Sequence, residues 1–547
     1  MDRRRFLRHM TLVSGSTLLP TLTGYGSSDS ADTHFFDTDS DPTFGAVEFL
    51  HGVASGDPLP DAVILWTRVT PMDPLSPTVR VAWELGLEQE LVRPVLSGRV
   101  DTTPERDYTV KVDVSGLEPG QTYYYRFCVG DQLSPVGRTR TAPTGTVEHL
   151  RLGFVTCGDY ARGLFNVYRR VAERDDLQAV VHLGDYIYEN DRDDVRPHDP
   201  PHELVTLADY RRRYAQYRSD PDLQALHRQH PMIWVWDDHE LANDSWRNGA
   251  EDHDPATDGD FWLRRASAFQ AAHEWLPIRT PDPADLSRIY RRFAFGELLD
   301  LIMIDARQVG RDEPLPPNSL LGEEVPVFTQ TGEFTDPARQ ILGAEQEQWL
   351  IEQLRASRAR WRILGNQVYF SPLKVLGTPR ALEGGGLYLS NDKWDGYAPA
   401  RDRALAVIAE VGNVVIMTGD AHEAYAFDVH DDPNNPLVYN RLTGEGSKAV
   451  EFVVTSATTR GDGVIGNSLS ARLQRLPENL EQLLHLTNPH LKYYNNRLNG
   501  YCLVDIDAER VRNEFWFVPM VSQPTDEESL GAVFECAHGT QRLQRSA

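Results

Sequence analysis

The stretch that decides the fold is AVVHLGDYIYE at residues 179–189, in which an apolar run ends at a glycine and is followed by an acid and a tyrosine. A short apolar run of this kind is typical of a strand buried on both faces, as in the sheet of an α/β domain. Gly184 allows a tight turn after the strand. Asp185 and Tyr188 are therefore expected at the carboxyl end of a sheet, where open α/β folds place their chemistry. Taken alone, a Gly-Asp pair is equally typical of an ordinary turn.

Three further predicted strands, at 152–156, 232–236 and 414–417, also end in residues that bind metals. The residues that follow them are Cys157, then Asp237, Asp238, His239 and Glu240, then Asp420 and His422. One acid at a strand end indicates a turn, whereas four such strand ends are better explained by one shared polynuclear metal site. Oxygen ligands with one thiolate and one phenolate fit iron(III) beside divalent ions better than zinc in a closed Cys/His site.

The regions around this site predict two kinds of domain. Residues 46–143 contain short alternating segments separated by turns, which predict a β-sandwich. Within it, LEPGQTY at 117–123 resembles the tyrosine corner of fibronectin type III domains. From residue 150 to residue 547 strands alternate with helices, which predicts an α/β domain. An amphipathic helix at 526–544 is expected to close over that domain.

Length and charge limit the function. A chain of 547 residues with 40% hydrophobic and 25% charged residues is expected to fold into at least two domains. Its net charge of −26 argues against nucleic acid or an anionic membrane surface as a partner, because both need a basic face. An acidic protein still binds phosphate when metal ions offset the repulsion.

The N-terminus indicates export. Residues 1–30 begin with MDRRRFLR followed by a weakly apolar run, and they resemble a twin-arginine signal peptide. Residues 31–45 are expected to be a flexible leader. Because no other segment has the roughly 18 unbroken apolar residues of a membrane span, we expect no transmembrane span in the mature chain. The twin-arginine machinery is then a partner, and the protein resides in the periplasm, cell envelope or extracellular space. The sequence leaves open whether two of Cys128, Cys502 and Cys536 form a disulfide.

Several motifs together resemble the PhoD-type alkaline phosphatase and phosphodiesterase family, within the calcineurin-like metallophosphoesterases. They are HGVASGDP at 51–58, LWTR at 65–68, LGDYIYE at 183–189, WDDHE at 236–240, DAR at 305–307, WDGY at 394–397 and GDAH at 419–422. The resemblance implies a metallophosphoesterase-type α/β sandwich of two mixed sheets flanked by helices, preceded by the fibronectin III-like β-sandwich.

The resemblance also implies a ligand set. Asp185 matches the carboxylate that bridges two metals in that superfamily. Asp238, His239 and Glu240 match its Gly-Asn-His-Glu motif with Asp in place of Asn, and Asp420 with His422 matches its Gly-His-x-His motif with Asp in place of the first His.

Fe3+ and Ca2+ are the metals that the resemblance implies. Cys157 and Tyr188 would bind the iron, and Asp238 and Asn243 are expected calcium ligands. Asp237 ranks lower, as a ligand or a turn-capping acid. Glu240 is expected to orient His239 or another ligand rather than to bind metal. One departure is that the family's usual Ser-Cys-Gln is Thr-Cys-Gly at 156–158.

The implied reaction is the hydrolysis of small phosphate monoesters and/or diesters. The metals would lower the pKa of a bound water, so that a hydroxide or oxide attacks phosphorus in line. His239 would contact the phosphate and protonate the leaving oxygen.

Four other residues or groups receive structural interpretations. His182 is expected to be a core histidine, and the arginines at 211–213 are expected on a solvated helix face. Asp305 and Arg307 are expected to form an ion pair near the site.

Two alternatives remain. A purple acid phosphatase also combines a β-sandwich with iron-tyrosinate chemistry, but its His-rich ligands are missing here. A non-catalytic envelope binding protein with a degenerate phosphatase domain is the alternative from another class, and the acids at all four strand ends argue against it.

Overall fold

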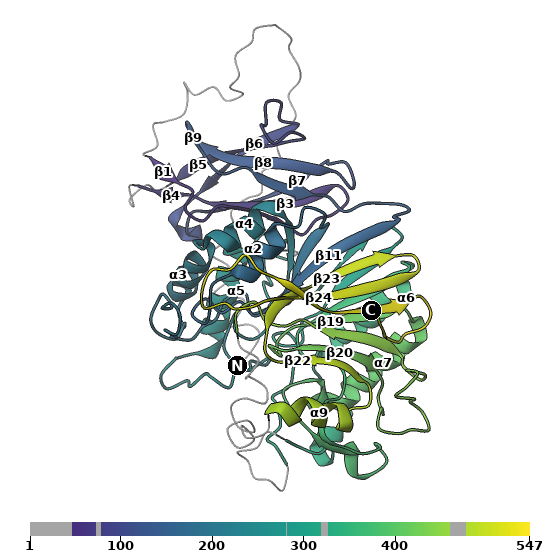
Figure 1. The fold of residues 1–547 in the computed structure, drawn as a ribbon. Coiled ribbons are helices and arrows are strands. Elements are labelled where there is room, and N and C mark those ends of the chain that lie inside the picture. Colours follow the sequence, from purple (N-terminus) through teal and green to yellow (C-terminus); the bar gives the residue numbers. More distant parts are fainter. Residues whose placement is uncertain (1–45, 73–77, 281, 319–326, 460–476, 547) are drawn as a thin grey trace.

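The computed structural model describes residues 46–72, 78–280, 282–318, 327–459 and 477–546 (Figure 1). The expected signal peptide and leader therefore lie outside the described residues. Within them, the apolar runs predicted as strands pair into two large sheets, because each run is too apolar to remain at the surface and its backbone groups need partners.

The first large sheet has ten strands in the order β26-β25-β24-β23-β11-β12-β13-β2-β3-β7. Their bounds, in chain order, are β2 (Val53–Gly56), β3 (Ala62–Arg68), β7 (Thr109–Ser115), β11 (His149–Val155), β12 (Ala179–His182), β13 (Pro231–Trp234), β23 (Asn499–Asp507), β24 (Arg510–Val518), β25 (Ser529–Ala537) and β26 (Gln544–Arg545). Its central strands β11, β12 and β13 are parallel, and β11 pairs with β23 in antiparallel fashion. The sheet is therefore mixed, and three of its carboxyl ends lie side by side.

The second large sheet has seven strands in the order β14-β15-β16-β19-β21-β20-β22. Their bounds are β14 (Arg291–Phe295), β15 (Leu299–Met303), β16 (Trp361–Asn366), β19 (Val414–Thr418), β20 (Ala424–Val429), β21 (Ala449–Val453) and β22 (Leu491–Asn495). It is also mixed, since β15, β16, β19 and β21 run parallel while β20 pairs with β21 in antiparallel fashion. The predicted strands in this part of the chain are thus confirmed.

The two large sheets pack face to face through one hydrophobic core. Across that core the ring of Phe452 on β21 meets the ring of Phe515 on β24, with centroids 6.1 Å apart. Helices α2 (Asn166–Ala172), α3 (Leu207–Arg218), α4 (Pro221–Gln229) and α5 (Phe261–Trp275) share this core with β11–β13. Helices α6 (Gly343–Ala356) and α7 (Ala398–Val411) pack on the second sheet, and α9 (Pro477–Thr487) lies near β22 (Figure 1). The expected sandwich of two mixed sheets flanked by helices is confirmed.

The N-terminal part forms a β-sandwich that is joined to this core. A smaller sheet contains β5 (Val79–Gly86), β6 (Leu96–Thr102), β8 (Thr122–Val129), β9 (Gln132–Leu133) and β10 (Gly137–Arg140). It packs against β3 and β7 through a separate cluster that includes Leu65, Val81 and Phe127. However, β2 pairs in parallel with β13, so one face of the sandwich belongs to the ten-stranded sheet.

Short elements complete the described chain. The two-stranded pairs are β1 (Val47–Glu48) with β4 (Thr70–Pro71), and β17 (Lys374–Gly377) with β18 (Gly386–Tyr388). The 3-10 turns are η1 (Pro104–Arg106), η2 (Gly332–Thr335), η3 (Glu383–Gly385) and η4 (Trp394–Tyr397). Among the described residues, no helix combines the length and the apolar character that crossing a membrane requires.

One expectation is wrong, and one question that the sequence left open is answered. The helix expected at 526–544 is instead β25 and β26, with β25 antiparallel to β24. The reason is that Ala532, Phe534 and Cys536 enter the core at a spacing of two residues, which is the period of a strand. The disulfide left open by the sequence is absent, since Cys128, Cys502 and Cys536 are all free and buried.

Candidate metal centre

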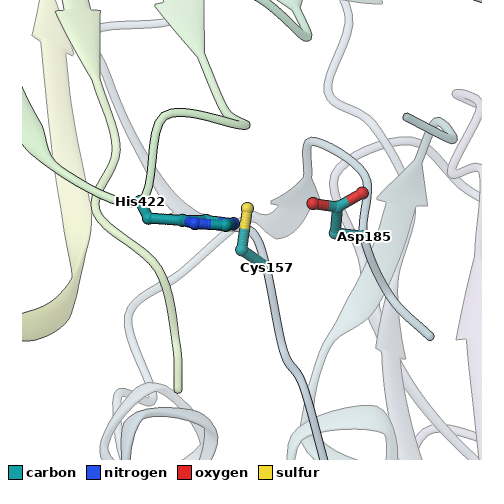
Figure 2. Close-up of side chains that lie close together, drawn as sticks. All are labelled: Cys157, Asp185 and His422. Atoms are coloured by element: carbon teal, nitrogen blue, oxygen red, sulfur yellow. The ribbon is translucent and has the colours of Figure 1, made fainter. Parts of the chain in front are cut away.

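Side chains from three strand ends meet at one point between the two large sheets. Cys157 follows β11, Asp185 follows β12 and His422 follows β19. Each offers a ligand atom, and these atoms all lie within 4.8 Å of one another. Figure 2 shows the three side chains approaching one another, with the sulfur between the imidazole and the carboxylate in this view. The Tyr188 hydroxyl joins them, because it donates to Asp185 Oδ2 at 3.1 Å and lies 3.2 Å from His422 Nε2.

Two further ligand groups overlap with the first. Asp185, Asp238 and His239 form one, and Asp237, Asp238 and Asp420 form the other, each with ligand atoms within 4.8 Å. Asp185 belongs to two groups and so does Asp238, which makes the arrangement a continuous row of three potential cation sites. The predicted ligands that carry a carboxylate, imidazole or thiol are therefore brought together.

The backbone at these strand ends is held in an unusual conformation. Cys157, Asp185, Asp420 and His422 have positive φ angles of 56°, 55°, 62° and 60°. Non-glycine residues adopt this left-handed region at a cost, and such residues cluster at functional sites. The two loops hold each other, because the Gly158 N–H donates to the Asp185 carbonyl at 2.9 Å.

Glu240 positions the loops instead of contributing a ligand. Its carboxylate accepts the backbone N–H of Tyr186 at 2.6 Å, of Asp237 at 2.8 Å and of Asp185 at 3.2 Å. Burial raises the pKa of Glu240 to about 7, against the effect of these three donors. The expectation that Glu240 orients His239 or another ligand agrees with its contact to the backbone of Asp185.

His239 is held by a residue for which the sequence suggested no role. Glu189 Oε2 lies 2.7 Å from His239 Nδ1, and the His239 ring stacks on Tyr188 with centroids 4.2 Å apart. Burial opposes a charge on His239, but Glu189, Asp238 and Asp185 outweigh it and raise the pKa of His239 well above its ordinary value. Glu189 ends the LGDYIYE motif, so an acid four residues after Asp185 in that motif was the available signal.

The contact that the structure gives Asn243 involves its backbone. Its backbone N–H donates to Glu189 Oε1 at 2.7 Å, which places it beside the His239 partner. No contact of its side-chain amide indicates a role, so its part as a calcium ligand stays a prediction.

Arg307 is the cation at the centre of the acidic groups. Its fully buried guanidinium lies 2.6 Å from Asp237, 2.5 Å from Asp420 and 2.9 Å from Asp392. The expected ion pair with Asp305 is wrong, because Asp305 accepts hydrogen bonds from Trp236 Nε1 and from the backbone of 307–308. Lys393 adds a second charge through ion pairs with Asp392 and Asp420. The two cations therefore fix the carboxylates and offset part of their repulsion.

The residues present fit metal ions. Asp237 Oδ2 is buried and has no hydrogen-bond partner among the described residues, which is costly unless a cation meets it. Burial also raises the pKa values of Cys157, Asp185 and Tyr188 well above their ordinary ranges. A buried thiol and phenol lose their protons when a metal coordinates them. A thiolate, a phenolate, an imidazole and a carboxylate form a donor set suited to iron(III), and the all-carboxylate group suits a hard divalent ion.

His182 lies where the sequence predicts, whereas Arg213 does not. His182 is fully buried and lies 3.0 Å from the Tyr168 hydroxyl through Nε2, and burial lowers its pKa to about 3, so it is the expected core histidine. Arg213 is not on a solvated face, because it is fully buried and donates to the backbone carbonyls of Tyr188 and Asn190. It thereby anchors the loop that carries Tyr188.

Two face-to-face mixed sheets with Asp, His, Cys and Tyr side chains gathered at their strand ends define the class of metallophosphoesterase-type α/β sandwiches. Family comparison agrees: residues 152–515 match the PhoD-like phosphatase model, and residues 36–143 match the model of the PhoD-like phosphatase N-terminal domain. The chain belongs to the PhoD-like phosphatase family, and it is a phosphatase enzyme.

Two relatives support this assignment over nearly the whole chain. Alkaline phosphatase D of Bacillus subtilis (strain 168) is 34% identical over 553 residues, which cover 97% of this chain and 87% of the relative. A solved structure described as "Structure of PhoD" has a TM-score of 0.79 at 33% identity and covers 93% of this chain and 94% of that chain. Membership of a phosphatase family leaves no support for a non-catalytic binding protein.

Proposed function

We propose that this protein is an exported phosphatase that hydrolyses phosphate monoesters and/or diesters at the metal centre described above. The observation that carries the proposal is the row of three overlapping ligand groups that share Asp185 and Asp238. Such a row suits adjacent cations, and adjacent cations suit the charge of a phosphoryl group in displacement.

The ligand assignment follows the chemistry of each group. Fe3+ would be held by Cys157, Asp185, Tyr188 and His422, the set that contains the thiol and the phenol. Ca2+ would be held by Asp238, Asp420 and Asn243, with Asp237 as a weaker candidate and Asp185 as the bridge. Bound metals supply an activated water and polarise the phosphoryl oxygens.

The chain itself supplies a positioned acid. Glu189 occupies Nδ1 of His239, and stacking on Tyr188 fixes the ring plane, so Nε2 is the atom left to meet the substrate. A protonated His239 would contact the phosphate and give its proton to the leaving oxygen. Arg307 and Lys393 would keep the carboxylates in place when the charge of the site changes.

The proposal also includes export of the protein and a fibronectin III-like N-terminal domain. Residues 1–30 resemble a twin-arginine signal, which would deliver the folded protein, with metals already bound, to the periplasm, cell envelope or extracellular space. The likeness of residues 46–143 to a fibronectin type III domain is supported by the Tyr123 hydroxyl, which accepts the Glu118 backbone N–H at 2.9 Å.

Metal analysis with visible absorption tests the ligand assignment. Protein purified without chelators should contain iron and calcium and show a phenolate-to-iron(III) band. Tyr188→Phe should remove that band, whereas Tyr186→Phe, a buried tyrosine that contacts His227, should keep it. A colourless protein containing zinc or manganese would overturn the iron assignment.

Activity is tested with one substitution and one treatment. Asp185→Asn should abolish metal retention and turnover of phosphate esters together, because Asp185 belongs to two ligand groups. Removing metals with a chelator should abolish turnover reversibly. An active variant that retains all its metal would contradict the bridging role.

A further inference from the structure

A cavity of about 660 Å³ opens in the catalytic domain and shares no lining residue with the metal centre. Three chain segments line it: residues 441–444, Lys492 on β22, and residues 542–545 with Phe534 of the C-terminal strands. Its volume is within the range of small-molecule binding sites. The phosphatase reaction proposed above does not use it.

The charge of this cavity contrasts with that of the whole molecule. The chain carries 81 acidic and 55 basic residues, yet three arginines line the cavity: Arg441, Arg542 and Arg545. None of the three makes an ion pair with an acid in the described part of the chain. The nearby Asp428 is already satisfied, by Lys492 at 3.1 Å and by the Tyr439 hydroxyl at 2.8 Å. The cavity therefore presents uncompensated positive charge, with Glu481 lining an adjoining hollow beside Arg441.

Two of these arginines are held in place by the protein. Arg542 Nη1 donates to the Thr443 carbonyl at 3.1 Å, which ties the C-terminal segment to the 441–444 loop. The Arg545 guanidinium lies 6.0 Å from the centre of the Phe534 ring. Leu442, which is 90% exposed, gives the cavity an apolar side next to the cations.

We propose that this cavity is a second, non-catalytic binding site for an organic phosphate, meaning a phosphate dianion attached to an apolar group. The guanidinium fork matches the oxygens of a phosphate and binds them with two charge-assisted hydrogen bonds. The apolar group would rest on Leu442. Two sources share this chemistry, a soluble phosphate compound and the headgroup of an anionic lipid.

Equilibrium dialysis of the metal-replete protein with phenylphosphonate tests the site, because a P–C bond is not hydrolysed as an ester. We expect two bound equivalents per chain, one at the metal centre and one in the cavity. Arg441→Ala/Arg542→Ala should lose the cavity equivalent, with affinity falling at least about tenfold, while kcat and the inhibition constant at the metal centre stay unchanged. Arg441→Lys/Arg542→Lys should keep part of the binding, and Arg93→Ala, an exposed arginine of the sandwich, should keep all of it.

The outcomes distinguish a soluble ligand from a lipid headgroup, and binding in the cavity from binding at the metal centre. Binding of soluble phenylphosphonate that depends on the arginine pair identifies a soluble ligand. Arginine-dependent binding only to vesicles containing phosphatidic acid identifies a lipid headgroup. Phenylphosphonate binding that is unaffected by Arg441→Ala/Arg542→Ala, together with no arginine-dependent binding to the vesicles, overturns the proposal. Loss of turnover in the parent protein would count against the proposed phosphatase reaction and not against the cavity.

Discussion

At the scale of single residues, the contact between Glu189 and His239 decides what His239 can do. A histidine beside a carboxylate is protonated at higher pH than an isolated one, because the negative charge favours the imidazolium. Here the effect is large enough to outweigh burial. In the proposed reaction, a cation held by Asp185 and Asp238 would act in the opposite direction, and Glu189 would keep His239 able to donate a proton.

Glu189→Gln should therefore lower the pKa of His239 and weaken catalysis. The folded-state pKa of His239 is raised, so the proton is present at low pH and is lost as pH rises through that pKa. Removing the charge of Glu189 moves the loss to lower pH, and the alkaline limb of the pH–rate profile should shift in that direction. We expect kcat/KM to fall about 10- to 100-fold.

The matched control for that substitution is Glu203→Gln. Glu203 lies near Glu189 and pairs with Arg264, and it has no hydrogen bond to His239. It should leave the alkaline limb in place. If both variants shift the limb equally, the effect is one of general charge and Glu189 has no positioning role.

A second prediction concerns His273, a buried histidine on α5. Burial, with Lys111 nearby, lowers its pKa to about 3. Because the folded-state pKa is lowered, the unfolded chain binds the proton more readily, and stability present above about pH 6.5 is lost as pH falls. Between pH 7 and pH 5 this amounts to about 2 kcal/mol. The free energy of unfolding of His273→Gln should fall less over that range than that of the parent protein, and parallel pH curves would contradict this.

Some site residues could be predicted from the sequence and others could not, for a physical reason. Asp185, Asp238 and Asp420 each follow an apolar strand, and strand ends of an α/β sheet converge whatever the rest of the chain does. Lys393 carries no such signal, and Arg307 follows β15 but takes its partners from acids that lie far along the chain. Their charges become meaningful only after the two sheets have packed.

At the scale of elements, the strand ends approach too closely to tolerate an added methyl group at Gly184. That residue has φ of 107°, and a Cβ there would lie 2.5 Å from both the Cβ and the backbone nitrogen of Asp237. The turns after β12 and β13 are thus fitted to each other. The same elements show why strand prediction succeeded: their runs are apolar throughout, and residues of this kind are buried on both faces of a sheet.

Gly184→Ala should push the two strand ends apart and reduce metal binding. Displacements of about 1 Å at a reacting centre cost about 100-fold in rate, so we expect a loss of that order in kcat together with lower metal content. Gly116→Ala is the matched control, because Gly116 also has a positive φ, of 82°, but a Cβ there would meet nothing within 4 Å. Equal loss of metal in both variants would mean that backbone strain, and not the contact with Asp237, is responsible.

The C-terminal strands show where element prediction fails. Residues 529–537 contain apolar residues at positions 530, 532, 533, 534, 536 and 537, a pattern too short to separate one helical turn from an edge strand. Their pairing with β24 settles the matter, and β24 lies within the last 40 residues of the chain. Tertiary pairing, which the local pattern does not encode, therefore decides this element.

At the scale of the whole molecule, the N-terminal sandwich and the catalytic sheets share structure. Beyond the pairing of β2 with β13, Ala54 and Trp66 belong to the main hydrophobic core. Trp66 Nε1 donates to the Glu274 carbonyl at 2.8 Å, and its ring lies 5.8 Å from that of Trp275 on α5. Separate domains with a small polar interface unfold independently, whereas a shared sheet and a shared core couple unfolding.

We therefore expect one cooperative unfolding transition for the metal-replete protein in differential scanning calorimetry. A chain that lacks residues 1–146 should not accumulate in soluble form, because it would leave the edge of β13 unpaired and expose Trp275. A chain that lacks only residues 1–45 is the control, since it keeps β2 and every described contact, and it should fold and unfold like the parent. Two resolved transitions, or a soluble and active chain beginning at residue 147, would show that the ten-stranded sheet is two independent sheets that merely touch at β2 and β13.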